Sequence, residues 1–102
     1  DLGRFAGCKG LQELVVHGRG VTDAGLALFN GHPALSRVNL YKTGVTDAGV
    51  AHLASCKMLH ILDVADTKVT DAGLAQLKDC KNLSSLTVSY TAVTDAGLAH
   101  LQ

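Results

Sequence analysis

Apolar and polar residues follow a pattern that recurs every 24 residues along the chain. Each repeat has apolar residues at its first, fourth and sixth positions, and variable residues separate the last two. This alternation predicts a short strand with one buried face. The apolar sets are Leu11, Leu14 and Val16; Leu35, Val38 and Leu40; Leu59, Leu62 and Val64; and Leu83, Leu86 and Val88.

The string Val-Thr-Asp-Ala-Gly follows each predicted strand, at residues 21–25, 45–49, 69–73 and 93–97. It reads as a helix start. The Thr is placed to act as an N-cap that accepts a backbone hydrogen bond, and the Asp falls in the first turn, where negative charge suits the helix dipole. The Gly lies four residues before an apolar residue and so shares its inward face. We interpret the Gly as a position that lets the helix approach the strand layer closely.

Strands that are joined by helices run parallel to one another. Because strands pack about 4.8 Å apart and helices about 8–10 Å apart, the stack should curve toward its strands. A fixed period of this length is typical of a solenoid. We therefore expect an α/β fold, a right-handed arc with a parallel sheet on its concave face and helices on its convex face.

The repeats form a single array over residues 1–102. It comprises a partial repeat at 1–10, complete repeats at 11–34, 35–58 and 59–82, and a truncated repeat at 83–102. In the partial repeat, Leu2, Phe5 and Cys8 align with columns of the later repeats. Since the chain opens and closes inside a predicted helix, we interpret it as a fragment of a longer chain.

The frame Leu-x-x-Leu-x-Leu-x-x-Thr-x-Val-Thr-Asp-Ala-Gly-Leu-x-x-Leu-x-x-Cys-x-x resembles the leucine-rich repeats, specifically the cysteine-containing subclass found in F-box-associated and bacterial repeat proteins. The repeat at 59–82 matches best. The ninth position departs from the family: Thr43, Thr67 and Thr91 stand where Asn or Cys is more frequent. In the first repeat Arg19 stands there, and His32 takes the Cys position. We expect that repeat to be locally irregular and Arg19 to turn outward.

Composition supports a folded chain without a strongly charged surface. Hydrophobic residues make up 47% and charged residues 18%, which is compatible with a core and not with disorder. Nine basic residues balance nine acidic ones, so neither a nucleic acid nor an anionic membrane is favoured as a partner. The apolar runs are too short for membrane insertion, and no targeting signal is visible.

Three cysteines, Cys8, Cys56 and Cys80, follow the repeat spacing. Their odd number and this spacing favour one buried structural position over a disulfide framework. A Cys56–Cys80 disulfide stays open as an alternative, because neighbouring repeats could bring the two thiols together. Unpaired thiols favour a reducing compartment, and we expect a cytoplasmic location.

Catalytic and metal-binding readings find little support. The five histidines are scattered, and a metal site built from Cys8, His32 and Cys56 would lack an evident fourth ligand. The column of motif Asp residues is explained better by helix capping than by a cation site. No phosphate-binding glycine loop is present, and no spacing dictates a nucleophile–base–acid set. We predict no enzymatic activity, no cofactor and no metal.

The strand residues that alternate with the core should face the concave side, and unlike the core columns they vary between repeats. Exposed side chains on a rigid scaffold are where recognition usually occurs, and Tyr and Arg are favoured at interface hot spots. We therefore predict a protein-interaction module; its alternative is a structural spacer or an array that self-associates end to end through uncapped repeats. The predicted partner-binding residues are His17, Arg37, Asn39, Tyr41, Asp63, Thr87 and Tyr90.

Overall fold

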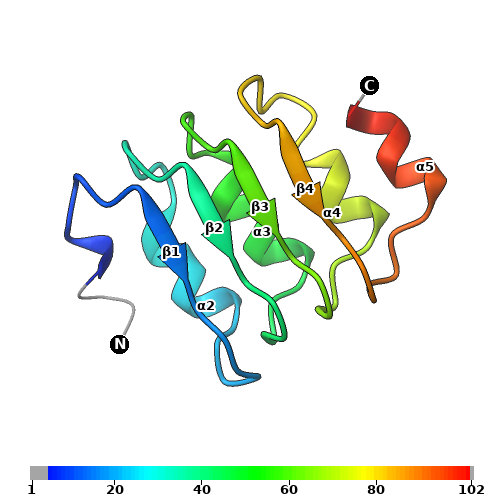
Figure 1. The fold of residues 1–102 in the computed structure, drawn as a ribbon, viewed down its shortest axis with the longest axis horizontal. Helices are drawn as coiled ribbons and strands as arrows, with labels where there is room; N and C mark the ends of the chain where they lie inside the picture. The colour runs from blue at the N-terminus through cyan, green and yellow to red at the C-terminus, as the bar shows by residue number, and fades with distance from the viewer. Residues whose placement is uncertain (1–4, 102) are drawn as a thin grey trace.

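The computed structural model describes residues 5–101 and has two layers, a sheet and a row of helices behind it (Figure 1). The described ends of the chain lie at opposite ends of the array. Leu2, which belongs to the predicted partial repeat, lies outside the described residues. The strands are β1 (Glu13–Val15), β2 (Arg37–Asn39), β3 (Ile61–Asp63) and β4 (Ser85–Thr87); the helices are α2 (Asp23–Leu26), α3 (Asp47–Ala54), α4 (Asp71–Ala75) and α5 (Asp95–Leu98), and the 3₁₀ turns η1 (Ala27–Phe29) and η2 (Ala99–Leu101) continue α2 and α5.

The sheet is parallel, with strand order β1-β2-β3-β4. Leu14 pairs with Val38, Val38 with Leu62 and Leu62 with Leu86, so the predicted apolar column lies in register through the sheet. These side chains meet the inward residues of the helices in a continuous core between the two layers. The predicted solenoid fold is confirmed.

The helices begin at the repeated motif, as predicted. Thr46, Thr70 and Thr94 are N-caps in extended conformation, and each hydroxyl accepts a hydrogen bond from the backbone N–H two residues later. Thr22 occupies the same position before α2, but its side chain makes no capping bond. The prediction of a side-chain cap is therefore wrong for Thr22.

The motif Asp joins each repeat to the next, a role that its first-turn position alone does not reveal. Oδ1 of Asp47 accepts from the backbone N–H of Thr70 at 2.7 Å, and its Oδ2 accepts from the Thr70 hydroxyl at 2.5 Å. The same pair of bonds joins Asp23 to Thr46 and Asp71 to Thr94. Each Thr hydroxyl thus donates to the preceding repeat while it caps its own helix, which fixes the hydroxyl's orientation.

The missing side chain of the motif Gly makes room for this Asp. We had predicted that it makes room for the strand layer. A Cβ at Gly73 would lie 2.5 Å from Oδ1 of Asp47, too close for any real side chain. At Gly49 and Gly97 the nearest atom to such a Cβ is again the carboxylate oxygen of the preceding repeat's Asp. The predicted contact of the Gly with the strand layer is therefore wrong, because the close approach is between neighbouring helices. We call this repeated arrangement of Asp, Thr and Gly the Asp–Thr–Gly contact.

A second inter-repeat column lies at the other end of the helices. The Cys56 thiol donates to the Phe29 carbonyl at 3.2 Å, and the Cys80 thiol donates to the Ala54 carbonyl at 3.5 Å. In the first repeat His32 takes this position and its Nε2 donates to the Cys8 carbonyl at 3.0 Å. The imidazole therefore makes the same kind of bond to the preceding repeat as the thiols do.

Of the three cysteines, Cys56 and Cys80 are free thiols, so the Cys56–Cys80 disulfide is not formed. Their burial differs: Cys56 is buried, Cys80 is half-buried and Cys8 is exposed. The prediction of one buried position therefore holds fully for Cys56 only. Burial raises the pKa values of the Cys56 and Cys80 thiols above that of an ordinary cysteine, because ionisation would place a charge in an apolar setting.

Threonine at the ninth position closes the turn after β2, β3 and β4. The hydroxyls of Thr43, Thr67 and Thr91 donate to the carbonyl three residues earlier at 2.6–2.8 Å. In the first repeat the Arg19 side chain is mostly exposed, as expected. It is nevertheless anchored: Nη1 donates to the carbonyls of Thr43 and Asp66, at 3.0 and 2.7 Å.

Candidate partner-binding face

The open face of the sheet, opposite the helices, carries the side chains that alternate with the core. The strand register arranges them in rows that cross all four strands. We call this surface the sheet face. Its first row is Glu13, Arg37, Ile61 and Ser85, and its second row is Val15, Asn39, Asp63 and Thr87.

A shallow depression of about 230 Å³ lies in the middle of the sheet face. Val15, which is 51% exposed, and Ile61 give it an apolar part. Four of the seven predicted partner-binding residues line it together: Arg37, Asn39, Asp63 and Thr87. Glu13, which the predicted set omitted, lines it as well.

Two of these lining residues also stabilise their own strand ends. Oδ1 of Asn39 accepts from the Tyr41 backbone N–H at 3.0 Å, and Oδ1 of Asp63 accepts from the Ala65 backbone N–H at 2.9 Å. Each side chain therefore has one acceptor oxygen committed to the fold. The local bond also fixes the orientation of the other polar atom of each side chain.

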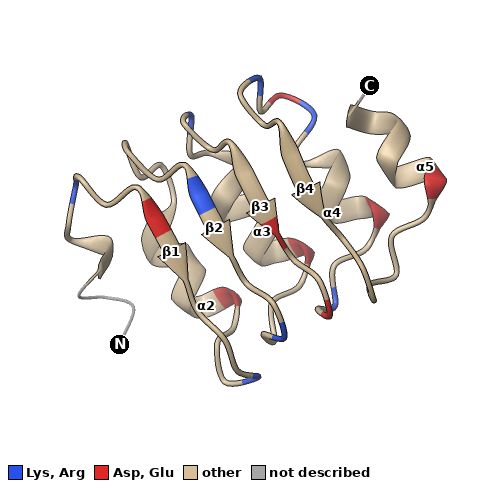
Figure 2. Ribbon diagram, viewed as in Figure 1, with Lys and Arg blue, Asp and Glu red and all other residues tan. Residues whose placement is uncertain are grey.

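The face carries charges of both signs at close quarters. Figure 2 shows the acidic position on β1 beside the basic position on β2. Glu13 and Arg37 are register partners, yet the one ion pair within residues 5–101 is Arg19–Asp66. Among the described residues, the planar set of N–H donors of Arg37 is therefore in no ion pair.

Beyond the strand ends, the Tyr41 ring contacts the side chains of His17 and Lys42. The ring of His17 meets the Tyr41 ring edge to face with 6.3 Å between centroids. The Lys42 ammonium lies 5.4 Å from the centroid of the same ring, within cation–π range. Of the predicted set, His17 and Tyr41 thus lie together, next to the depression's strands and not in its lining.

The eighth residue of every repeat adopts a left-handed backbone conformation. Gly18 has φ 104°, and Lys42, Asp66 and Tyr90 have φ 59°, 54° and 58°. For a residue other than Gly, this conformation costs roughly 1–2 kcal/mol. Lys42 contacts the Tyr41 ring and Asp66 pairs with Arg19. Tyr90 is 86% exposed and does not line the depression.

Metal-ligating side chains do not converge in the part of the chain that the structure describes. There, no cluster of three or more His, Cys, Asp or Glu side chains could hold a metal ion, so Cys8, His32 and Cys56 do not form a metal site. His32 bonds to backbone groups at both ring nitrogens. None of the helices in this part of the chain is long and apolar enough to cross a bilayer.

Comparison with known proteins agrees with the repeat pattern. A family model described as a leucine-rich repeat matches residues 55–77. The chain folds as a leucine-rich repeat solenoid. An internalin of known crystal structure from Listeria monocytogenes is similar, with a TM-score of 0.57 and 19% identity; the likeness covers all of this chain and 36% of the internalin chain. At that identity it shows the fold alone. The comparison with curated proteins found no match.

Within this repeat array, sequence reasoning missed one ion pair that lies beside the sheet face. Asp66 was not among the predicted partner-binding residues, but Arg19 reaches across two repeats to its carboxylate at 3.0 Å. Arg19 interrupts the Thr column of the ninth position, and that break was the signal available. The length of an Arg side chain, which spans neighbouring repeats, explains why its partner lies 47 residues away.

Proposed function

We propose that this leucine-rich repeat array is a non-catalytic interaction module that binds a partner protein through the sheet face. One observation carries the proposal: within a register-aligned sheet, the outward side chains differ from strand to strand. The buried side of the same strands repeats Leu and Val in every copy. Packing accounts for the buried side and leaves the variation of the outward side unexplained.

The chemistry of the face suits a protein partner. The depression is lined by an apolar pair and by charges of both signs, and Arg37 and Tyr41 belong to the residue types that contribute most at protein interfaces. A nucleic acid would require a surplus of positive charge, whereas basic and acidic residues balance in this chain. We therefore propose that Arg37 receives an acceptor group of the partner and that Tyr41 gives it an aromatic contact.

A capture experiment with matched variants tests this proposal. Arg37→Ala/Tyr41→Ala removes the two main contacts, and Lys57→Ala/Lys68→Ala is a control at exposed positions outside the sheet face. We expect the first variant to retain at least about tenfold less of any partner that the parent captures, as the loss of hot-spot side chains would produce. The control variant should retain the partner fully. Both double variants should unfold at the same midpoint as the parent. Equal retention by both double variants would refute the sheet face as the binding surface.

A second candidate function is self-association of the array. The residue that follows the motif Gly is fully buried at Leu26, Val50 and Leu74, where another helix stacks beyond it. In α5 its counterpart Leu98 is 40% exposed. Among the described residues, Leu98 therefore occupies an apolar position that a neighbouring helix covers in the earlier repeats.

We also propose a reducing compartment, and within it the cytoplasm. The Cys56 and Cys80 thiols donate hydrogen bonds that a disulfide would remove, which supports a reduced state. The test is alkylation of the protein in intact cells followed by mass spectrometry. Free, alkylated Cys56 and Cys80 are expected, and a Cys56–Cys80 disulfide in cells would contradict the proposal.

A further inference from the structure

The outward side chains of β2 and of the residues just after it differ in hydrogen-bonding character from those of the neighbouring strands. Arg37 carries only N–H donors, and its side chain makes no hydrogen bond or ion pair within residues 5–101. The Asn39 amide oxygen accepts from the Tyr41 backbone N–H, so the amide nitrogen, a donor, is the polar atom that the described part of the fold does not use. Lys42 is exposed and adds an ammonium group, which also only donates. We call Arg37, Asn39, Tyr41 and Lys42 the donor column.

The strands on either side of the donor column carry carboxylates. Glu13 on β1 is the register partner of Arg37, and Asp63 on β3 is the register partner of Asn39. Charge is therefore of one sign along β2 and of mixed sign across the strands. A partner segment that runs along β2 meets donors at every contact, whereas a segment that crosses the strands meets both donors and carboxylates.

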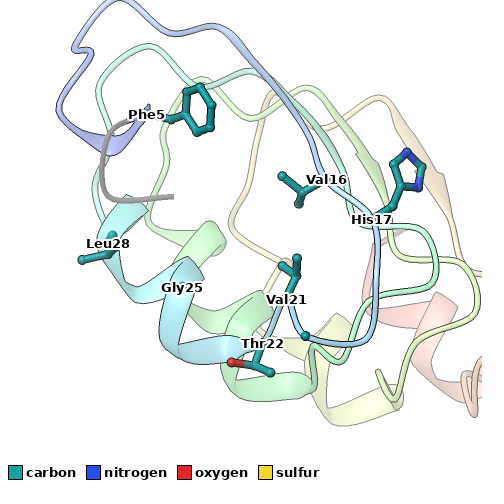
Figure 3. A pocket seen from close by; sticks show the side chains of 8 residues that line it. Phe5, Val16, His17, Val21, Thr22, Gly25 and Leu28 are labelled. Carbon is teal, nitrogen blue, oxygen red and sulfur yellow. The ribbon is translucent and has the colours of Figure 1, made fainter. Parts of the chain in front are cut away.

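The spacing of the donor column matches that of an extended chain. Outward side chains recur at every second residue of a strand, about 6.6 Å apart, and the side chains on one side of an extended partner segment recur at the same interval. This alternation continues beyond the strand ends: Figure 3 shows Val16 and His17 on opposite sides of the backbone, and the His17 ring contacts the Tyr41 ring. An extended segment can therefore meet Arg37, Asn39 and Tyr41 with successive alternate side chains.

Lys42 is held at the end of the donor column by two features. Its backbone has φ 59°, a left-handed conformation that residues other than Gly seldom adopt. Its ammonium lies 5.4 Å from the centroid of the Tyr41 ring, and this cation–π contact gives the charge a defined place beside the ring. The donor column therefore has a positive charge at each of its ends, Arg37 and Lys42.

We propose that the sheet face binds an extended, acidic segment of a partner protein along β2. One acidic side chain of the segment accepts hydrogen bonds from Arg37, and another, two alternate positions further on, lies beside Lys42. The side chain between them accepts from the Asn39 amide nitrogen. Val15 and Ile61, which line the depression on the two sides of β2, contact the aliphatic parts of the segment. The proposal rests on the proposed function of the sheet face and specifies the chemistry of its partner.

The flanking carboxylates restrict where such a segment can lie. Glu13 and Asp63 repel acidic side chains that are placed over β1 or β3, and repulsion of misplaced partners is a source of specificity. Glu13 also weakens binding of an acidic side chain to Arg37, because the two residues are register partners. Removal of the Glu13 charge should therefore strengthen the binding of an acidic segment.

Fluorescence polarisation with three labelled synthetic peptides tests the acidic preference. In each peptide of about seven residues, Thr, which favours an extended backbone, alternates with Glu, Gln or Lys. We expect the Glu peptide to bind the parent at least about tenfold more tightly than the Lys peptide, with the Gln peptide in between. A thymidine oligonucleotide of the same negative charge is the control for unspecific attraction of polyanions and should bind more weakly than the Glu peptide.

Variants locate the bound peptide. Arg37→Ala should weaken binding of the Glu peptide about tenfold, and Glu13→Gln should strengthen it about twofold. Lys57→Ala/Lys68→Ala removes positive charge from exposed positions outside the sheet face and should leave the affinity within about twofold of the parent. On addition of the Glu peptide, backbone amide shifts in NMR spectra should be largest at residues 37–42 and small on β4. Circular dichroism establishes that all variants are folded.

The possible failures are distinguishable. A Glu peptide that does not bind at about 1 mM, or binds no more tightly than the other two peptides or the oligonucleotide, overturns the acidic partner. If Lys57→Ala/Lys68→Ala weakens its binding more than Arg37→Ala does, or if the amide shifts extend across all four strands, the position along β2 is overturned. In each of these cases the capture experiment with Arg37→Ala/Tyr41→Ala decides separately whether the sheet face binds a partner, because it does not depend on the peptides.

Discussion

The helix starts and the sheet face share one 24-residue period but behave in opposite ways. At the helix starts, Asp47 binds Thr70 and fills the space left by Gly73, so each residue is shaped by a residue of another repeat. On the sheet face, the register partners Glu13 and Arg37 form no ion pair with each other. Repeats have identical residues at positions that contact a neighbouring repeat in the same way each time. They differ at positions where no such repeated contact is made.

The largest change in stability is expected from a substitution at Gly73. In Gly73→Ala the added methyl group collides with the Asp47 carboxylate, and we expect a net loss of roughly 1–2 kcal/mol, since overpacking outweighs the gain in helix propensity. Chemical denaturation monitored by circular dichroism measures this loss. Gly10→Ala is the matched control, because a Cβ there meets no atom within 4 Å. An equal response of the two variants would mean that Gly73 is not held by its neighbour.

A change beside the sheet face is expected to act in the opposite direction. Tyr90 has a positive φ and an almost wholly exposed ring, so Tyr90→Gly should raise the free energy of unfolding by about 1 kcal/mol through relief of backbone strain. Tyr90→Ala keeps the strained conformation and serves as the control, with no gain expected. A destabilising Tyr90→Gly variant would show that the tyrosine side chain contributes to the fold, which would contradict this prediction.

The smallest effect concerns pH. Hydrogen bonds from Thr94 lower the pKa of Asp71 below its ordinary value of 3.8. Because the folded pKa is the lower one, the carboxylate stabilises the fold above pH 3.8, and this contribution disappears as the pH falls through the folded pKa. Asp71→Asn should therefore lower the unfolding midpoint at pH 7 and have a smaller effect near pH 3. The same difference at both pH values would contradict the assignment of the lowered pKa to this contact.

Sequence reasoning succeeded where a residue's role is local or periodic. The strand columns, the helix starts and the Thr46, Thr70 and Thr94 caps follow from short-range rules, and the structure has them. The role of the motif Gly was misassigned, because its partner is an Asp of another repeat. That contact depends on how closely neighbouring helices stack, which no residue pattern specifies.

The candidate site was predictable in its location and less so in its detail. Alternation along the strands placed Arg37 and Asp63 on one face, and both line the same depression. The left-handed conformation at Tyr90 and the reach of Arg19 to Asp66 could not be foreseen, since both arise from turn geometry and side-chain length. Whether these residues bind a partner stays a prediction.

A double-mutant cycle between Asp47 and Gly73 tests the central claim most directly. Asp47→Ala, Gly73→Ala and the double variant are compared by equilibrium denaturation. If one residue exists to accommodate the other, Gly73→Ala should be destabilising in the parent and neutral or stabilising once Asp47 is Ala, with a coupling energy of about 1–3 kcal/mol. Costs that add to within about 0.5 kcal/mol would show the two sites to be independent and would contradict the account.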